Sequence, residues 1–251
     1  MKGNARIMGR IISMASGKGG VGKSTVSVML AYNLAKLSKK VLVIDMDKGL
    51  RSLDLMLNVT KKTIFDLSDI LSGNCKKADA IYKSDYNENL SVITASLDTD
   101  FDLDPEKFFE LLKELRESYD FVILDAPAGL GKGFFISTCL SETAFLVTTP
   151  DPLCVRDVRL AADEIEREIS IPLRLIINRV KSEPFFYKGI KSFDDIIDMS
   201  GVQLFGIVYE DSVMVNGLLN GEIEEDSDSF YALNRIARRL CGEKVPLKMK
   251  Y

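Results

Sequence analysis

The sequence predicts an α/β fold in which a doubly wound, mostly parallel β-sheet carries helices on both faces. Short and mostly continuous apolar runs recur along the 251 residues, as is typical of strands buried on both faces of a parallel sheet. Segments with apolar residues at helical spacing lie between these runs, and this alternation favours right-handed crossovers. Neither an internal repeat nor a Gly-, Pro- or Ser-rich linker divides the chain, so residues 1–251 are predicted to form one domain.

The apolar runs place the expected strands, in chain order, at Ile11–Ala15, Val41–Ile44, Leu90–Thr94, Phe121–Leu124, Ala144–Val147, Leu173–Ile177 and Leu204–Val208. Helical patterns between and after them cover residues 26–37, 105–115, 160–169 and 230–240. Asp104 and Pro105 mark the start of the second helix, because Asp is favoured as an N-cap and Pro at the first helical position.

Composition excludes several classes of function. The chain has no histidine, which rules out histidine-based acid–base chemistry, Ser-His-Asp triads and imidazole metal sites. Its four cysteines are widely spaced without a CxxC pair, as expected of reduced thiols in a cytoplasmic protein. The net charge of −4 argues against a dedicated nucleic-acid binder. No apolar run is long enough to span a membrane, and no secretory signal is expected.

A glycine-rich loop joins the first expected strand to the first expected helix. Its spacing, Gly17-x4-Gly22-Lys23-Ser24, fits the P-loop pattern. Glycines let the backbone N–H groups surround phosphate oxygens, and the following helix adds its positive N-terminal end. We expect Lys23 to neutralise phosphate charge and the Ser24 hydroxyl to coordinate Mg²⁺. The nucleotide-binding residues predicted in this loop are Gly17, Lys18, Gly19, Gly20, Val21, Gly22, Lys23, Ser24 and Thr25.

Two further expected strands end in aspartate. Asp47 follows the run at 41–44, and Asp125 follows the run at 121–124. Strand ends beside a P-loop point toward the bound phosphates, so an aspartate there is placed for nucleotide chemistry. An apolar run ending in aspartate is typical of the Walker B segment, which holds Mg²⁺ directly or through its water shell. Asp125 and Ser24 are therefore the predicted metal ligands. A helix cap or a loop aspartate is the structural alternative for Asp47.

As a set, three segments resemble the MinD/ParA family of deviant Walker A ATPases, and its MinD branch in particular. Residues 17–25 read GKGGVGKST, with the early lysine of that family at Lys18. Residues 45–54 read DMDKGLRSLD, and residues 125–129 read DAPAG. The resemblance covers roughly residues 10–247 and implies a P-loop NTPase fold.

The resemblance also implies roles for individual residues. Lys18, Asp47 and Asp125 take the catalytic positions: Lys18 reaches the nucleotide of a partner subunit, and Asp47 positions and polarises the attacking water. Asn178 takes the position that hydrogen-bonds adenine, with Arg179 beside it. A guanine pocket would carry an N-K-x-D signature, whereas residues 178–181 read NRVK, so ATP is favoured over GTP. The implied cofactors are ATP and Mg²⁺.

The function implied is an ATPase that dimerises with ATP and hydrolyses it as a spatial switch in division-site placement. A protein regulator, MinC- or MinE-like, would stimulate hydrolysis, although Arg159 stands where the family often has an acidic residue. The alternatives are a ParA-type partitioning ATPase and a MinD-like regulator of flagellum or pilus placement. The charge balance offers little support for binding to DNA, and no sequence-specific nucleic acid is expected.

A short basic tail raises the question of membrane contact. Only Glu243–Tyr251 follow Gly242, and Pro246 interrupts any helix there. Three lysines among a few apolar residues give at most weak, reversible attraction to anionic lipid. We therefore expect membrane contact to be weak or absent and the protein to be cytoplasmic, with peripheral contact at the inner face of the cell membrane as the alternative.

Overall fold

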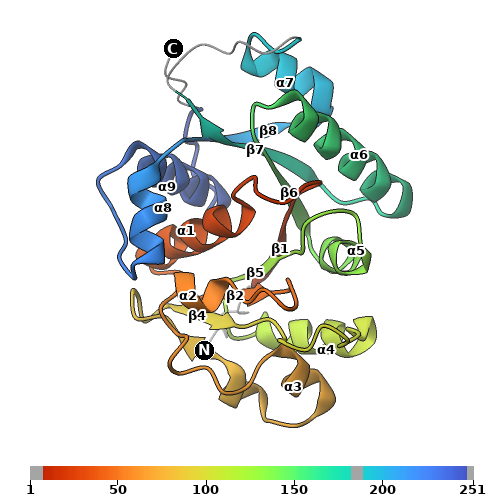
Figure 1. Ribbon diagram of the computed structural model, residues 1–251, viewed down its shortest axis with the longest axis vertical. Helices are drawn as coiled ribbons and strands as arrows, with labels where there is room; N and C mark the ends of the chain where they lie inside the picture. Colours follow the sequence, from red (N-terminus) through yellow and green to blue (C-terminus); the bar gives the residue numbers. More distant parts are fainter. Residues whose placement is uncertain (1–7, 182–188, 248–251) are drawn as a thin grey trace, which may run out of the picture.

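One mostly parallel sheet forms the centre of the molecule (Figure 1). The computed structural model describes residues 8–181 and 189–247. The strands are β1 (Arg10–Ala15), β2 (Val41–Asp45), β3 (Tyr82–Lys83), β4 (Leu90–Ile93), β5 (Phe121–Asp125), β6 (Thr143–Thr148), β7 (Leu173–Val180) and β8 (Leu204–Tyr209). They lie in the order β3-β4-β2-β5-β1-β6-β7-β8, and the described pairs are parallel except for β3 with β4. The predicted doubly wound sheet is confirmed.

Helices cover both faces of the sheet (Figure 1). One face carries α1 (Lys23–Lys36), α2 (Leu53–Met56), α8 (Ser212–Leu219) and α9 (Asp228–Leu240). The other carries α3 (Leu67–Ser72), α4 (Pro105–Leu115), α5 (Lys132–Cys139), α6 (Pro152–Glu168) and α7 (Phe193–Ser200), with a 3₁₀ helix η1 at Lys77–Ala80.

Alternation along β2 shows how one strand serves two cores. Val41 and Val43 pack with α1 and α9, whereas Leu42 and Ile44 pack on the opposite side with α4. Successive side chains of a strand point to opposite faces, so a continuous apolar run is required where both faces are covered. The expected strands were recognised for this reason.

Several short elements were not predicted from the sequence. The structure adds the two-residue antiparallel β3 and the helices α2, α3, α5, α7 and α8. The helix expected at 160–169 begins earlier, at Pro152, because the Asp151 side chain accepts hydrogen bonds from the backbone N–H groups of Leu153 and Cys154. Strand β7 continues to Val180, with a register shift against β8 that makes a bulge at 178–179.

The site lies where β1, β2 and β5 end, near the middle of the sheet. Strand β1 is hydrogen-bonded to β5 on one side and to β6 on the other, and β2 pairs with β5. Their carboxyl ends therefore meet at one edge, where ligands of open α/β sheets bind.

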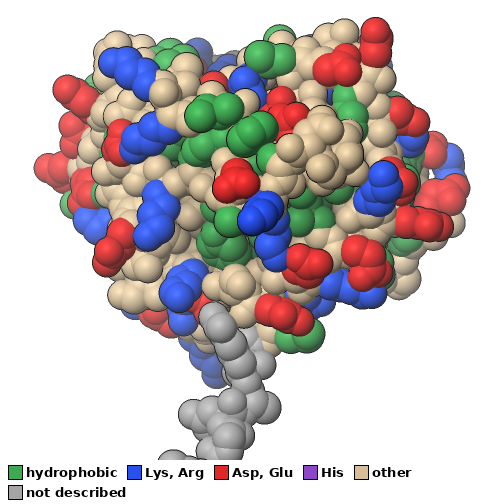
Figure 2. Space-filling view, turned by 90° about the horizontal axis from the view of Figure 1, so that it is seen from below, with side chains coloured by type: hydrophobic (Ala, Val, Ile, Leu, Met, Phe, Trp, Pro, Cys, Tyr) green, Lys and Arg blue, Asp and Glu red, His purple; other side chains and the backbone are tan. Residues whose placement is uncertain are grey.

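The surface charges are mixed. Figure 2, which views the molecule from below relative to Figure 1, shows acidic and basic side chains interspersed on that face rather than gathered into a basic surface. Among the described residues, no helix combines the length and apolar character needed to cross a membrane. The tail prediction for residues 248–251 lies outside the described part of the chain.

Candidate functional site: a phosphate loop beside two acidic strand ends

The loop between β1 and α1 has a backbone that requires glycine at two positions. Gly20 and Gly22 have φ values of 84° and 87°, in the left-handed region that other residues rarely adopt. Gly17 packs against α6, because a Cβ there would lie 2.4 Å from the carbonyl oxygen of Asp157. Gly22 caps α1 without a side-chain hydrogen bond, and no acidic residue lies in the first turn. The helix therefore presents free N–H groups to an anion, and its own first turn adds no negative charge.

Three side chains from α1 converge on Asp125. The Lys23 ammonium lies 2.9 Å from Asp125 Oδ2, and the Ser24 hydroxyl donates to the same oxygen at 2.7 Å. Lys23 and Asp125 are buried, with side chains 6% and 0% exposed. The residues predicted to meet phosphate and metal are thus brought together by the fold.

Ser27 completes this cluster and was missed in the sequence. Its hydroxyl donates to Asp125 Oδ1 at 2.6 Å, so both carboxylate oxygens have protein donors. Ser27 lies four residues after Lys23 on the same helix, which places the two on one face. That spacing was the available signal, but a serine inside an apolar helix is not distinctive.

The segment after β2 carries the other acidic side chains. Asp45 is fully buried and accepts hydrogen bonds from the backbone N–H groups of Asp47, at 3.0 Å, and Leu53, at 3.3 Å. Burial and then the neighbouring charge of Asp125 raise the pKa of Asp45 to about 7. Asp47 is partly buried, and burial raises its pKa, while Lys23 opposes that change. A carboxylate with a raised pKa is a better proton acceptor.

The segment after β5 is tied to the phosphate loop by backbone hydrogen bonds. The N–H of Ala126 donates to the carbonyl of Met14, and the N–H of Gly129 donates to the carbonyl of Ser16 at 3.1 Å. Gly129 has a φ of 84° with open space around its Cβ position. The segment after β5 is therefore joined through the backbone to the start of the phosphate loop.

Asn178 supports the phosphate loop. Its Nδ2 donates to the carbonyl of Val21 at 2.8 Å and lies so close to Gly22 that a Cβ there would be 2.4 Å away. The bulge in β7 aims Asn178 inward, and Arg179, with a φ of 55°, is exposed. The predicted contact of these two residues with adenine stays a prediction.

The remaining loop residues face solvent to different extents. Lys18, Gly19 and Gly20 are exposed, Val21 is buried, and Thr25 is partly buried. Lys18 makes no hydrogen bond or ion pair to another residue of the described ranges. Unlike Lys23, it is therefore available to charge outside its own subunit.

The residues present fit a magnesium nucleotide. The glycine backbone and the free end of α1 suit phosphate oxygens, and a hydroxyl beside a carboxylate is a donor set that Mg²⁺ prefers. The Ser16 hydroxyl, buried directly before the loop, has no hydrogen-bond partner in the described structure, so it is free to serve a ligand. ATP phosphates bound here would compete with Asp125 for Lys23.

The fold and the site together define a P-loop ATPase. A family model described as an AAA domain matches residues 9–160. The septum site-determining protein MinD of Bacillus subtilis (strain 168) is 34% identical over 248 residues, covering 96% of this chain and 92% of the relative. The MinC:MinD complex of Aquifex aeolicus matches with a TM-score of 0.88 and 33% identity, covering 96% of this chain and 98% of that one.

A further solved relative is a nucleotide complex. The MinD protein of Pyrococcus horikoshii complexed with Mg-ADP matches with a TM-score of 0.81 and 30% identity, covering 95% of this chain and 100% of the other. The chain belongs to the MinD/ParA family of P-loop ATPases, with MinD proteins among its relatives.

Proposed function

We propose that this chain is a MinD-like switch that binds Mg-ATP, dimerises in the ATP state and hydrolyses the nucleotide to return to monomer. The observation that carries the proposal is the convergence of Lys23 and Ser24 on Asp125, beside Asp47 at the same sheet edge. The output that fits its septum site-determining relatives is placement of the division site. Residues 1–251 act in this proposal as one P-loop ATPase domain.

Each side chain has a role that follows from its position. Lys23 leaves Asp125 to bind phosphate, and the backbone of residues 17–22 donates N–H groups to the phosphate oxygens. Ser24 and Asp125 hold Mg²⁺, which when bound neutralises charge on the phosphates. Asp47 accepts a hydrogen bond from the attacking water, and its raised pKa strengthens it as an acceptor. Asn178 and Arg179 are assigned to the adenine base.

In this proposal Lys18 stabilises the dimer by neutralising phosphate charge across the interface. Two triphosphates that face each other across an interface repel, and a lysine from each subunit lowers that repulsion. Lys18 is exposed and unpaired within the described residues, whereas Lys23 is buried and committed to Asp125. The dimer should therefore require both the nucleotide and Lys18.

A regulator that stimulates hydrolysis, MinC- or MinE-like, completes the cycle. Helix α6 offers exposed side chains for such a partner at Leu153 and Leu160. Arg159, which stands where the family often has an acidic residue, lies on the same helix. Its guanidinium is 2.7 Å from the Asp163 carboxylate, which partly neutralises its positive charge. In this proposal the chain makes weak contact or none with a membrane. The chain also acts without binding a specific nucleic-acid sequence.

Light scattering tests the switch. The Asp47→Ala variant should be a dimer with Mg-ATP and a monomer with ADP, because hydrolysis is blocked while binding persists. Adding Lys18→Ala should restore the monomer, whereas adding Lys61→Ala, another exposed lysine without a described partner, should not. ATP turnover by the unaltered chain should stop when EDTA removes Mg²⁺. A dimer that persists without Lys18, or that forms without nucleotide, would contradict the proposal.

A further inference from the structure

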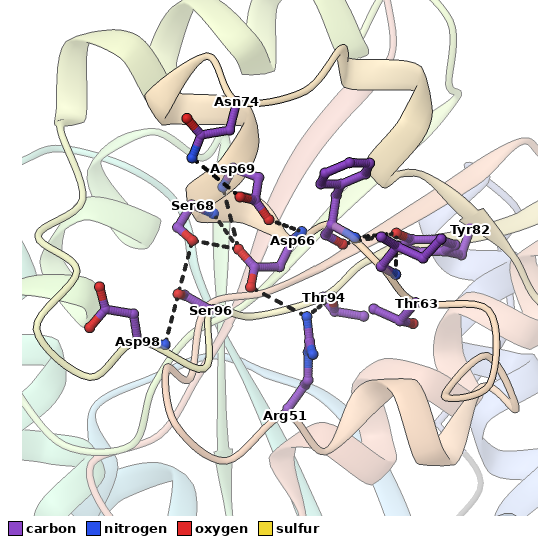
Figure 3. Close-up of polar contacts among 12 residues, drawn as sticks. Arg51, Thr63, Asp66, Ser68, Asp69, Asn74, Tyr82, Thr94, Ser96 and Asp98 are labelled. Atoms are coloured by element: carbon purple, nitrogen blue, oxygen red, sulfur yellow. Dashed lines mark hydrogen bonds and ion pairs between the residues drawn. The ribbon is translucent and has the colours of Figure 1, made fainter.

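Arg51, in the segment that follows Asp47, turns its side chain into the protein. Its backbone is left-handed, with a φ of 45°, a conformation that residues other than glycine adopt only where surrounding contacts hold them. Its side chain is 15% exposed, and Nη2 lies 3.2 Å from the Thr94 hydroxyl and 3.3 Å from Asp66 Oδ2. Figure 3 shows the guanidinium group directed toward both residues.

The two residues that receive Arg51 are themselves fixed. Asp66 is the N-cap of α3, and its Oδ1 accepts from the backbone N–H of Ser68 at 2.8 Å. The reciprocal bond of a capping box runs from the N–H of Asp66 to Asp69, which leaves Oδ2 for Arg51 (Figure 3). Thr94 is fully buried directly after β4, and its carbonyl accepts from the N–H of Leu67. Arg51 therefore joins a loop to a rigid support.

The loop needs such a support because Leu50, the one apolar side chain among residues 47–52, is exposed and so does not anchor the loop. A cavity of about 160 Å³ lies against it, lined by residues that include Met46, Lys48, Leu67, Phe101 and Pro127. The backbone N–H groups that tie the loop to its surroundings include the two donors to Asp45 and that of Gly49, which donates to the carbonyl of Ser96 at 2.8 Å. Other backbone bonds, such as that from Leu50 to Asp47, stay within the loop.

Two side chains of residues 47–52 reach across to another segment, and they differ in burial. The Lys48 ammonium reaches the carbonyl of Phe101 at 3.0 Å but is exposed to solvent. The Arg51 group is mostly buried and meets a carboxylate, so its contacts are stronger and less screened. Arg51 Nε is buried without a partner, so this guanidinium is only partly satisfied.

We infer that Arg51 is a positioning residue for hydrolysis: its contacts with Asp66 and Thr94 fix the loop that carries Asp47. The inference rests on the proposed function, since it assigns to Asp47 the orientation of the attacking water. Arg51 acts through the loop and not on the nucleotide, because its guanidinium is directed to Asp66 and Thr94. The phosphate-binding residues lie elsewhere, in the loop between β1 and α1 and in the first turn of α1. Loss of Arg51 should lower the rate of hydrolysis and leave nucleotide affinity unchanged.

The test compares variants of the full chain in steady-state ATP hydrolysis and in binding of ATP by calorimetry. Arg51→Ala should lower kcat roughly 10- to 100-fold, the range that small misplacements of catalytic groups cause. Arg51→Lys should be intermediate, because the shorter lysine keeps the positive charge but not the reach that brings Nη2 to both Asp66 and Thr94. Thr94→Val keeps the shape of the buried side chain, removes one acceptor and should lower kcat a few-fold. Arg167→Ala removes an arginine from an exposed pair on α6 and serves as the matched control.

Two results separate positioning from general destabilisation. ATP affinity should stay within about twofold in all four variants, because binding and chemistry are carried by different residues. In single-turnover experiments, Arg51→Ala combined with Thr94→Val should be no slower than Arg51→Ala alone, since the two residues make one contact. Full activity of Arg51→Ala, a loss of affinity parallel to the loss of kcat, or an additive loss in the double variant would overturn the inference. Absence of hydrolysis by the unaltered chain would instead overturn the proposed function, and this inference with it.

Discussion

The two acidic strand ends of the site are neighbours, yet they are held in opposite ways. Asp45 and Asp125 are paired in register between β2 and β5, and both are fully buried. Asp125 is bound by side chains of α1, through an ion pair with Lys23 and a hydrogen bond from Ser24. Asp45 instead accepts hydrogen bonds from backbone N–H groups at the start and the end of the loop that follows it. The first arrangement is suited to an exchange of ligands, and the second to the shaping of a loop.

The electrostatic surroundings differ in the same sense. Asp125 has a lysine ammonium 2.9 Å from one oxygen, while Asp45 has no cation in contact with it among the described residues. Burial without a paired cation favours the neutral acid, and this is why the pKa of Asp45 is raised to about 7. Charge pairing therefore organises the phosphate-loop region, whereas backbone hydrogen bonds to Asp45 organise the loop after β2.

The largest effect is expected from a substitution that removes the ion pair between Lys23 and Asp125. Lys23→Ala should lower ATP affinity at least about 100-fold, or about 2.7 kcal/mol, because phosphate then meets the charge of Asp125 without the compensating lysine. Calorimetric titration with Mg-ATP measures this. Lys36→Ala is the control, since Lys36 lies on the same helix in an exposed pair with Glu225. Unchanged affinity in Lys23→Ala would refute the assignment of the phosphate loop.

The next effect concerns the pH dependence of stability without nucleotide. The pKa of Asp45 is raised in the folded chain from 3.8 to about 7, so the folded state binds a proton that the unfolded state releases between these values. The free energy of unfolding should therefore fall as pH rises through this window. Compared with Asp45→Asn, the unaltered chain should lose roughly 2–3 kcal/mol between pH 5 and 7, at 1.36 kcal/mol per pH unit.

Urea unfolding of both chains at several pH values measures this difference. The Asn variant keeps the shape of the side chain and cannot ionise, so it serves as the reference at each pH. Parallel pH profiles for the two chains would contradict the raised pKa.

The comparison also explains what the sequence could predict. Lys23, Ser24 and Asp125 were recognised because their neighbours in sequence carry the information: a glycine spacing, a strand before it and an apolar run ending in aspartate. The fold then brings those residues together, because parallel strand ends meet at one edge. The central strands were predicted for the similar reason that burial on both faces demands a continuous apolar run.

The supports of the loop after β2 could not be read in this way. Arg51 meets Asp66 and Thr94, which are 15 and 43 positions away, and no spacing rule connects them. Asp66 looks like an ordinary helix cap in the sequence, and α3 is too short to show a helical stripe. Such contacts depend on tertiary packing, so the structure was needed to find them.

A smaller effect is expected from removing the hydrogen bond to the second carboxylate oxygen of Asp125. Ser27→Ala removes the donor to Asp125 Oδ1 and should destabilise the chain by about 1–3 kcal/mol, the cost of leaving a buried acceptor unsatisfied. Ser72→Ala, at an exposed position in the last turn of α3, should stay within about 0.5 kcal/mol. Urea unfolding measures both. Equal stabilities would indicate that Asp125 does not need its second donor.

The smallest expected effect compares one glycine from each region. Gly20 in the phosphate loop and Gly49 in the loop after β2 have nearly the same φ, 84° and 85°. Alanine should cost about 1 kcal/mol at either position, because a Cβ disfavours this conformation. A Cβ at Gly20 meets nothing within 4 Å, whereas one at Gly49 lies 3.0 Å from Thr99 Cγ2. Gly49→Ala should therefore have the lower Tm of the two without nucleotide. A lower Tm for Gly20→Ala would show that the phosphate loop, and not the loop after β2, is the more tightly constrained backbone.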